Sequence, residues 1–244
     1  MKRALVTGGS GGLGRAMVER LLGLGCLVVS VDRAEIPPGA TGIVCDLASR
    51  EEVDRALPVI IGAGPYEVVV LNAGVSATGR FEAVPFEAYR RLMTVNAETP
   101  MVLAAALMRA GAATRRMAFV SSLSHFTGYP GAAVYAASKD ALAVYAKSVR
   151  KPFARNGVSV TLACPGPLRT QHAERHAPTG ADPARRMEPA DAARAILDAT
   201  LAGRRFVAPG ANARLAALAG TLFPGAMTRQ MRRLIFERLE RETW

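Results

Sequence analysis

Short runs of β-branched and other apolar residues alternate with longer stretches of helical periodicity along almost the whole chain of 244 residues. The apolar runs are nearly continuous, as expected for strands that are buried on both faces of a parallel sheet. Successive parallel strands need crossover connections, and right-handed crossovers place helices on both faces. The sequence therefore predicts an α/β fold with a doubly wound parallel sheet of about seven strands. We expect these strands at 4–7, 27–31, 43–45, 68–71, 117–121, 158–163 and 206–208.

The stretches between these runs carry the spacing of amphipathic helices. No linker-like segment interrupts the alternation, so we expect a single domain with a helical C-terminal extension at 211–244. The longest irregular segment, at about 168–188, is a candidate functional loop, because long loops in compact domains usually serve function. The predicted helices lie at 13–24, 50–57, 86–110, 132–154, 189–201 and 211–223.

Composition excludes several classes of protein. Apolar residues make up 50% and charged residues 21% of the chain, which is typical of a globular protein. No apolar run reaches the ~18 residues that a membrane span needs, and the N-terminus lacks the pattern of a signal peptide. The three cysteines are scattered, which argues against a disulfide framework and favours a cytoplasmic location. His172 and His176 are four residues apart but lack a third ligand, so we predict no metal site.

The positive charge is unevenly distributed. The net charge is +11, of which residues 1–122 contribute +2 and residues 123–244 contribute +9. Of the 31 basic residues, 27 are arginines, so part of this excess fits a compositional bias toward Arg and Ala. No helix-turn-helix or zinc pattern accompanies the charge, so we predict no nucleic-acid partner. The basic half leaves room for an anionic substrate.

A glycine-rich segment joins the first predicted strand to the first predicted helix. Residues 7–14 read TGGSGGLG. Glycines let the backbone turn sharply, and the N-terminus of the following helix offers free N–H groups to a phosphate. No Lys-Ser or Lys-Thr follows, which disfavours a nucleoside triphosphatase loop. At the first strand-to-helix turn, this pattern predicts a Rossmann-type site for a dinucleotide diphosphate.

Acidic residues follow the second and third predicted strands. Asp32 lies 18 residues after Gly14, near the spacing at which a carboxylate binds the adenosine ribose of NAD. A carboxylate there repels a 2′-phosphate, so NAD is favoured over NADP. Arg33 complicates this prediction, because a guanidinium at the neighbouring position could bind that phosphate. Asp46, followed by Leu47, is placed to reach the adenine, although a capping role explains Asp46 equally well.

A tyrosine and a lysine share one face of the helix predicted at 132–154. Tyr135 and Lys139 are four residues apart, which is one helical turn. A nearby cation favours the phenolate, so we expect Lys139 to lower the pKa of Tyr135 toward the working range of an acid–base group. Ser122 ends the fifth strand, at the carboxyl edge where doubly wound sheets bind ligands.

These motifs occur together and in one order, with Asn72-Ala73-Gly74 after the fourth strand and Pro165-Gly166 after the sixth. In this combination the chain resembles the short-chain dehydrogenase/reductase family over residues of about 2–210. The resemblance implies catalytic roles for Ser122, Tyr135, Lys139 and Asn96. Tyr135 would be the general acid/base, Lys139 would bind the nicotinamide ribose, and Asn96 would hold a proton-relay water. The predicted cofactor residues are Gly8, Ser10, Gly12, Leu13, Gly14, Asp32, Arg33, Asp46, Leu47, Asn72, Ala73, Gly74, Tyr135, Lys139, Pro165, Gly166, Leu168 and Thr170.

The resemblance also implies an activity. We expect residues 1–210 to form an oxidoreductase domain that transfers a hydride between NAD and a small-molecule secondary alcohol or ketone. Reduction of a 3-oxoacyl thioester on acyl carrier protein or coenzyme A is one alternative. A dinucleotide-sensing protein without turnover is another, although the intact Ser122, Tyr135 and Lys139 count against it. The family resemblance further implies a homodimer or homotetramer.

The C-terminal extension leaves three alternatives open. Apolar residues recur at helical spacing on one face, with arginines largely elsewhere. This stripe could pack on its own domain or on a second subunit, which we favour. It could instead lie on an anionic membrane surface, or it could cover a long apolar substrate. The residues of the stripe are Met227, Met231, Leu234, Ile235 and Leu239.

Overall fold

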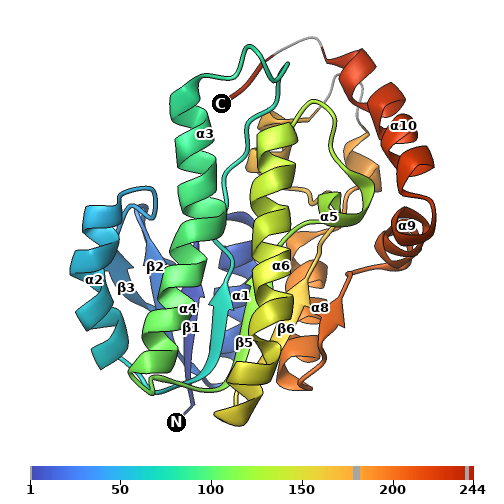
Figure 1. Cartoon of the computed structure of the whole chain (residues 1–244). Helices are drawn as coiled ribbons and strands as arrows, with labels where there is room; N and C mark the ends of the chain where they lie inside the picture. The colour runs from blue at the N-terminus through green and yellow to red at the C-terminus, as the bar shows by residue number, and fades with distance from the viewer. Residues whose placement is uncertain (1, 178–181, 240–241) are drawn as a thin grey trace.

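A single sheet of parallel strands runs through the centre of the molecule in the computed structural model (Figure 1), which describes residues 2–177, 182–239 and 242–244. Its order is β3-β2-β1-β4-β5-β6-β7, and every neighbouring pair is parallel. The order reverses between β1 and β4, which makes the crevice at their carboxyl ends a topological switch point. The predicted fold class is confirmed. The strands are β1 Arg3–Thr7, β2 Leu27–Asp32, β3 Thr41–Val44, β4 Tyr66–Leu71, β5 Ala113–Val120, β6 Ser159–Ala163 and β7 Phe206–Val207.

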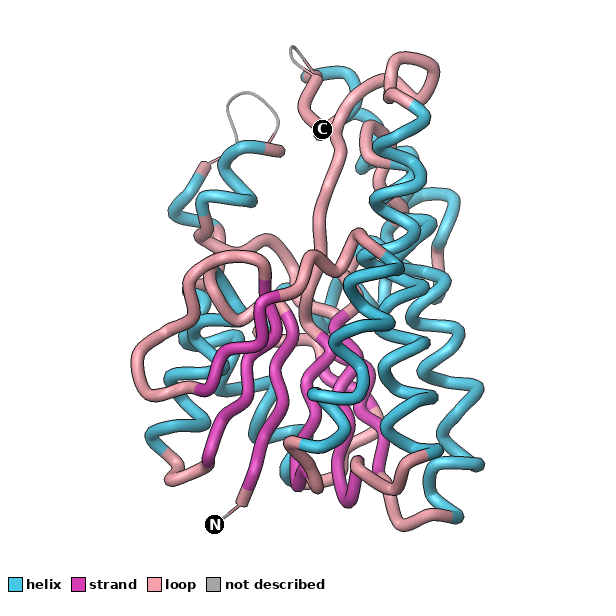
Figure 2. The backbone as a smooth tube through the Cα atoms, turned by 90° about the vertical axis from the view of Figure 1, so that its left-hand side faces the viewer, coloured by secondary structure: helices cyan, strands magenta, loops and turns pink. Residues whose placement is uncertain are grey.

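Helices cover both faces of the sheet, as the side view in Figure 2 shows. On one face α1 (Gly12–Gly23) packs against α8 (Pro189–Leu201). The other face carries α2 (Arg50–Gly62), α4 (Thr99–Arg109) and α6 (Ala133–Arg155). The strands contribute alternate residues to the two cores, as strands buried on both faces must. The shorter helices are α3 Phe86–Met93, α5 Ser124–Thr127, α7 Gln171–Arg175, α9 Ala211–Leu222 and α10 Pro224–Leu234.

The helix predicted at 86–110 contains a π-helical turn. The structure has α3, then a π-helical turn at Thr94–Glu98, then α4. Pro100 lies in the first turn of α4, where its missing N–H costs nothing, but an unbroken α-helix through this point would lose a hydrogen bond. The wider turn absorbs that break, so the helix predicted at 86–110 is confirmed as one helical stretch over 86–109, but with a π-helical turn inside it that was not predicted.

Two other segments differ from prediction. The irregular loop at 168–188 contains α7 and a 3₁₀ turn at Pro183–Arg185, while its residues 178–181 lie outside the described part of the chain. The C-terminal helix ends at Leu234, and a 3₁₀ turn at Phe236–Arg238 follows it. The predicted stripe therefore does not continue along one helix to Leu239.

The C-terminal residues return to the segment that follows β4. Thr243 pairs with Thr78 in an antiparallel bridge, with N···O distances of 2.7 and 2.8 Å. Gly79 lies beside Trp244, with its Cβ position 3.2 Å from the indole ring. In the described part of the chain, every helix is too short or too polar to cross a lipid bilayer.

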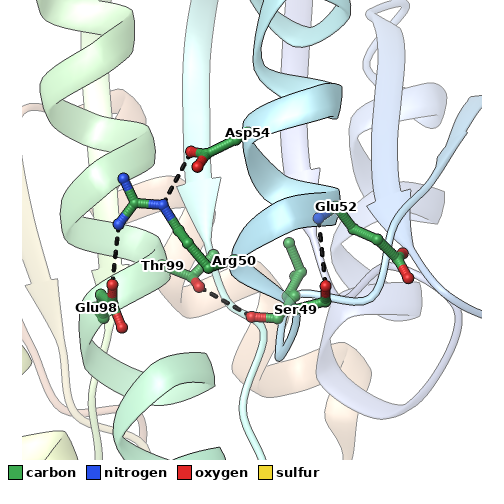
Figure 3. A network of polar contacts seen from close by, with 7 residues as sticks. Ser49, Arg50, Glu52, Asp54, Glu98 and Thr99 are labelled. Carbon is green, nitrogen blue, oxygen red and sulfur yellow. Dashed lines mark hydrogen bonds and ion pairs between the residues drawn. The ribbon is translucent and has the colours of Figure 1, made fainter.

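A network of polar contacts joins the start of α2 to the start of α4 (Figure 3). Arg50 donates from Nε to Asp54 at 2.9 Å and from Nη1 to Glu98 at 3.0 Å. The hydroxyl of Thr99 donates to the carbonyl of Leu47 at 2.9 Å. These contacts fix the loop after β3, which carries two of the predicted cofactor residues.

The end of β1 is joined to the end of β4 by a buried threonine. The Thr7 hydroxyl, in a residue that is 2% exposed, accepts from the backbone N–H groups of Asn72 at 3.0 Å and Ala73 at 3.1 Å. Thr7 therefore positions the segment 72–74 at the switch point.

We expect Thr7→Val to destabilise the fold by about 2–4 kcal/mol, because the isosteric side chain leaves two backbone donors without an acceptor. Thr7→Ser is the matched control, since it keeps the hydroxyl and loses only a methyl group. Urea unfolding of both variants measures the difference. A Val variant as stable as the Ser variant would contradict the assigned role.

Candidate active site

A cavity of ≈ 1290 Å³ opens at the carboxyl ends of the strands. It runs from Asp32 and Asp46, beside β2 and β3, to Tyr135 and to α10 at the opposite end. Every residue predicted for the cofactor lines this cavity. Of the predicted catalytic residues, Ser122, Tyr135 and Lys139 line the cavity and Asn96 does not.

The glycine turn leaves no room for side chains. A Cβ on Gly14 would lie 1.9 Å from the Gly8 carbonyl oxygen, so α1 begins in direct contact with the end of β1. Gly12 has a φ of +52°, and its Cβ position lies 3.2 Å from the methyl group of Thr170, which borders the turn on its other side. The bare backbone at the start of α1 suits a diphosphate, because helix N-termini present unpaired N–H groups. These residues therefore fit a dinucleotide.

The carboxylate of Asp32 is held beside the glycine turn. Its Oδ2 accepts from the backbone N–H of Ser10 at 3.0 Å and from the Ser10 hydroxyl at 2.6 Å. Its Oδ1 accepts from the backbone N–H of Arg33 at 2.7 Å. The Arg33 side chain points toward Asp46, with Nη1 to Oδ2 at 3.9 Å, and both side chains are exposed. Because exposed ion pairs contribute little, Arg33 remains able to turn toward a phosphate.

Tyr135 and Ser122 meet at the end of β5. A hydrogen bond from Ser122 acts to lower the pKa of Tyr135, but burial raises that pKa by more. The net shift of the Tyr135 pKa is therefore upward, and Lys139 is not among its causes, so a lowering of this pKa by Lys139 stays a prediction. Tyr135 is held near Ser122 in its neutral, phenol form.

The Lys139 side chain is buried and directed at the backbone. It is 3% exposed, and its Nζ donates to the Val120 carbonyl at 3.0 Å. Burial lowers the pKa of Lys139 to about 8. Gly74 leaves the necessary space, because a Cβ there would lie 2.9 Å from Nζ. The glycine of the segment 72–74 thus allows the lysine to reach the cavity wall.

Asn96 lies in the π-helical turn, behind the cavity wall. Its Oδ1 accepts from the Val75 N–H at 2.8 Å, and its Nδ2 donates to the Val75 carbonyl and the Ser138 hydroxyl, both at 2.9 Å. The side-chain amide is thereby committed to protein groups on both ends. Its observed contacts join β4, the π turn and α6, and a role in holding water stays a prediction.

Several cavity residues were not predicted as site residues. Thr7 is not part of the cavity lining, but it supports the segment 72–74 that is, and its position directly before the glycines could have suggested this role. Tyr129 and Arg186 line the same end of the cavity as Tyr135, but no motif marks either one. His172 also lines this end, and burial lowers its pKa. In the ranges 2–177, 182–239 and 242–244, no group of three or more potential metal ligands occurs.

Residues of the C-terminal stripe lie against the cavity and against their own domain, whereas apolar residues of the preceding helix are exposed. Met231, Leu234 and Ile235 line the far end of the cavity, which favours a role in covering the substrate. Ile235 also contacts its own domain, with a methyl group 3.7 Å from the Cβ position of Gly131. On α9, by contrast, Leu215, Leu218 and Leu222 are 58–68% exposed.

Comparison with known proteins gives consistent results. The family model of short chain dehydrogenases matches residues 2–180. The 3-oxoacyl-[acyl-carrier-protein] reductase MabA of Mycobacterium tuberculosis is 31% identical over 173 residues, which are 69% of this chain and 70% of that protein. A sorbitol dehydrogenase of Cereibacter sphaeroides is 28% identical over 184 residues, covering 70% of this chain and 72% of the relative. A crystal structure of a short chain dehydrogenase from Burkholderia cenocepacia with NADP superimposes with a TM-score of 0.81 at 25% identity, over 95% of this chain and 99% of that chain.

Lys139 gives a pH-dependent contribution to stability. Its pKa is lowered from 10.5 to about 8 on folding, so between these values the unfolded chain binds more protons than the native one. The free energy of unfolding should therefore rise with pH in this window, by up to about 1 kcal/mol per pH unit. Urea titrations of the wild type and of Lys139→Met across this range measure the effect. The difference in the free energy of unfolding between the two proteins should change with pH. A constant difference would contradict an environment of Lys139 that disfavours its charged form.

Proposed function

Because the chain belongs to the short-chain dehydrogenase family, we propose that it transfers a hydride between a nicotinamide dinucleotide and a secondary alcohol or ketone. The observation that carries this proposal is one continuous cavity that joins the bare glycine turn to Tyr135, Ser122 and Lys139. The glycine turn would bind the diphosphate, and the segments at 72–74 and 165–170 would flank the ribose and the nicotinamide. Asp32 and the loop at 46–47 would bind the adenosine.

The residues at the other end of the cavity would move the proton. The bound dinucleotide supplies an acceptor for hydride at C4 of its nicotinamide, or the corresponding donor in the reverse direction. Ser122 would donate a hydrogen bond to the substrate oxygen and fix its position. In alcohol oxidation, the Tyr135 phenol would first lose its proton to water, and the resulting phenolate oxygen would take the hydroxyl proton while the carbinol carbon loses its hydride and becomes a carbonyl. In ketone reduction, Tyr135 returns that proton to the new alcohol oxygen. Lys139 would bind the ribose hydroxyls beside Tyr135.

The cofactor preference is a finer proposal. We propose NAD, since the Asp32 carboxylate lies where the adenosine ribose would bind and would repel a 2′-phosphate. The Burkholderia relative holds NADP, and Arg33 offers a cation for its phosphate. The preference depends on whether the repulsion of the 2′-phosphate by Asp32 outweighs its attraction by Arg33.

A second candidate substrate has specific support. The relative MabA is named as a 3-oxoacyl-[acyl-carrier-protein] reductase, and the excess of +9 in residues 123–244 would suit an acidic carrier. A dinucleotide-binding protein without turnover is disfavoured, because Ser122, Tyr135 and Lys139 all line one cavity. Self-association as a homodimer or homotetramer belongs to the same proposal and rests on family resemblance.

We predict that Tyr135→Phe lowers turnover by at least about 100-fold, because the variant lacks the group that exchanges the proton. Binding of the dinucleotide should stay nearly unchanged, as the phenyl ring remains in place. A panel of alcohols and ketones, scanned for the change in nicotinamide absorbance, identifies a substrate for this comparison. Wild-type activity in the purified variant would remove Tyr135 from its assigned role.

We predict that Asp32→Ala lowers the ratio of kcat/KM for NAD to kcat/KM for NADP by about 10-fold. The variant loses acceptors for the ribose hydroxyls of NAD, and it no longer repels the 2′-phosphate of NADP. Arg33→Ala is the matched comparison and should change the ratio in the opposite direction. The measurement is kcat/KM for both cofactors with one substrate at saturation. An unchanged ratio in both variants would show that neither residue reads the ribose.

A further inference from the structure

Arg186 lies on a fixed part of the loop between β6 and α8. Its backbone N–H donates to the Pro183 carbonyl at 3.1 Å and closes the 3₁₀ turn. The next residue, Met187, pairs with Leu168 in a parallel bridge, and Met187 donates to the Pro167 carbonyl at 3.1 Å. The backbone at 186–187 is therefore held by hydrogen bonds. The guanidinium projects from this anchored position toward the cavity.

One donor of the Arg186 guanidinium has no acceptor within the described part of the chain. Its Nη1 is buried and has no hydrogen-bond partner among the described residues, and no ion pair within them includes Arg186. The arginines nearby in sequence are different, because Arg169 pairs with Glu188 at 2.5 Å and Arg185 pairs with Asp182 at 3.7 Å. A buried donor on a cation that lacks an acceptor is unfavourable. Arg186 thus marks a place where an acceptor from outside the chain would be stabilised.

A second donor group lies beside it. Tyr129 lines the same end of the cavity, and its ring packs edge-on against that of Tyr135 with centroids 6.2 Å apart. The charge of Arg186 acts on the Tyr129 hydroxyl, which places the guanidinium near this ring. Burial nevertheless raises the pKa of Tyr129 to about 12, so its hydroxyl stays protonated and can donate. A cation and an O–H donor therefore line the cavity together, the second of them on a ring that packs against Tyr135.

Acidic side chains do not neutralise this end of the cavity. Among the described residues that line it, the carboxylates are Asp32 and Asp46 at the adenosine end, and Asp182. Asp182 is engaged with Arg185, and its Oδ1 accepts from the Ala184 N–H at 2.9 Å. Burial lowers the pKa of His172, which disfavours a positive charge there. Among the described residues, two cations at this end of the cavity are therefore without an acidic partner: the ammonium of Lys139, which donates to the Val120 carbonyl, and the guanidinium of Arg186, whose Nη1 has no acceptor.

We propose that Arg186 and Tyr129 bind an oxyanion of the substrate, so that the substrate is an alcohol or ketone carrying a carboxylate or phosphate a few bonds from the reacting carbon. This inference rests on the proposed function and narrows it to an anionic substrate class. A guanidinium binds both anions through paired N–H donors, and such charge-assisted contacts are stronger than neutral ones. Arg186 acts as a specificity-determining residue, because it holds the far end of the molecule and leaves the reacting atoms to Tyr135.

The test compares ketones that differ only in charge. The carboxylate arm uses 3-oxobutanoate and 4-oxopentanoate against their methyl esters, and the phosphate arm uses dihydroxyacetone phosphate against dihydroxyacetone. We expect at least one anion to be reduced roughly 10- to 100-fold more efficiently than its neutral partner, as loss of a charge-assisted contact predicts. The arm that shows the larger preference identifies the anion.

Variants then assign this preference to the residue. Arg186→Gln should raise KM for the preferred anion by roughly 10- to 100-fold, with a smaller change in kcat and little effect on the neutral partner. Arg186→Lys should restore part of the loss, because it keeps the charge without the paired donors. Arg185→Gln is the control for charge alone, since it removes an arginine whose side chain is 89% exposed. The dissociation constant of NADH should be the same in all three variants.

The outcomes separate this inference from the proposed function. Equal efficiency with anions and with neutral ketones overturns the inference and leaves the proposed oxidoreductase function intact. The same holds if Arg186→Gln raises KM equally for the anion and its neutral partner, or if it weakens NADH binding. Should no compound be turned over, the proposed function fails in this panel, and calorimetric binding of the anions to protein mixed with NADH decides the inference. Binding that Arg186→Gln abolishes supports the oxyanion site, and its absence in the wild type overturns it.

Discussion

The close approach of the glycine turn to the ends of β1 and β4 is the constraint on which the rest of the site depends. The start of α1 touches the Gly8 carbonyl so closely that only a glycine fits at position 14. The Thr7 hydroxyl binds two backbone N–H groups of the next strand's end, which holds the segment 72–74 against the turn. Gly74 in turn leaves space for Lys139 from α6. One chain of contacts therefore runs from the glycine turn to α6, which carries Tyr135 and Lys139.

Burial shapes the electrostatics of the reaction end more than charge pairing does. It raises the pKa of Tyr135 and lowers that of Lys139, so both side chains are disfavoured in their charged forms. Ser122 is the neighbour whose hydrogen bond opposes this for the phenol. Arg186 differs, because guanidinium groups keep their proton in proteins. A lysine with a pKa of about 8 still holds most of its charge at neutral pH, so Lys139 and Arg186 are both cations beside a neutral Tyr135 phenol, which agrees with the anionic substrate proposed above.

Local patterns in the sequence predicted most of the fold. The apolar runs placed all seven strands near their observed positions, since strands buried on both faces carry little besides apolar residues. The turn at 94–98 was missed, because the conflict at Pro100 shows only as a proline near the middle of an otherwise helical pattern. The positions of Tyr129, Arg186 and Thr243 depend on contacts between segments far apart in the chain, such as the bridge from Thr78 to Thr243. No local spacing encodes such contacts, so only the structure shows which side chains line the cavity.

The most direct measurement is calorimetric titration of the purified full chain with NADH and, in parallel, with NADPH. The cavity at the switch point predicts saturable binding of at least one of the two, with one dinucleotide per chain and competition by the oxidised form. A complete absence of binding for both cofactors would contradict the assignment of the glycine turn and of the cavity that extends from it to Tyr135.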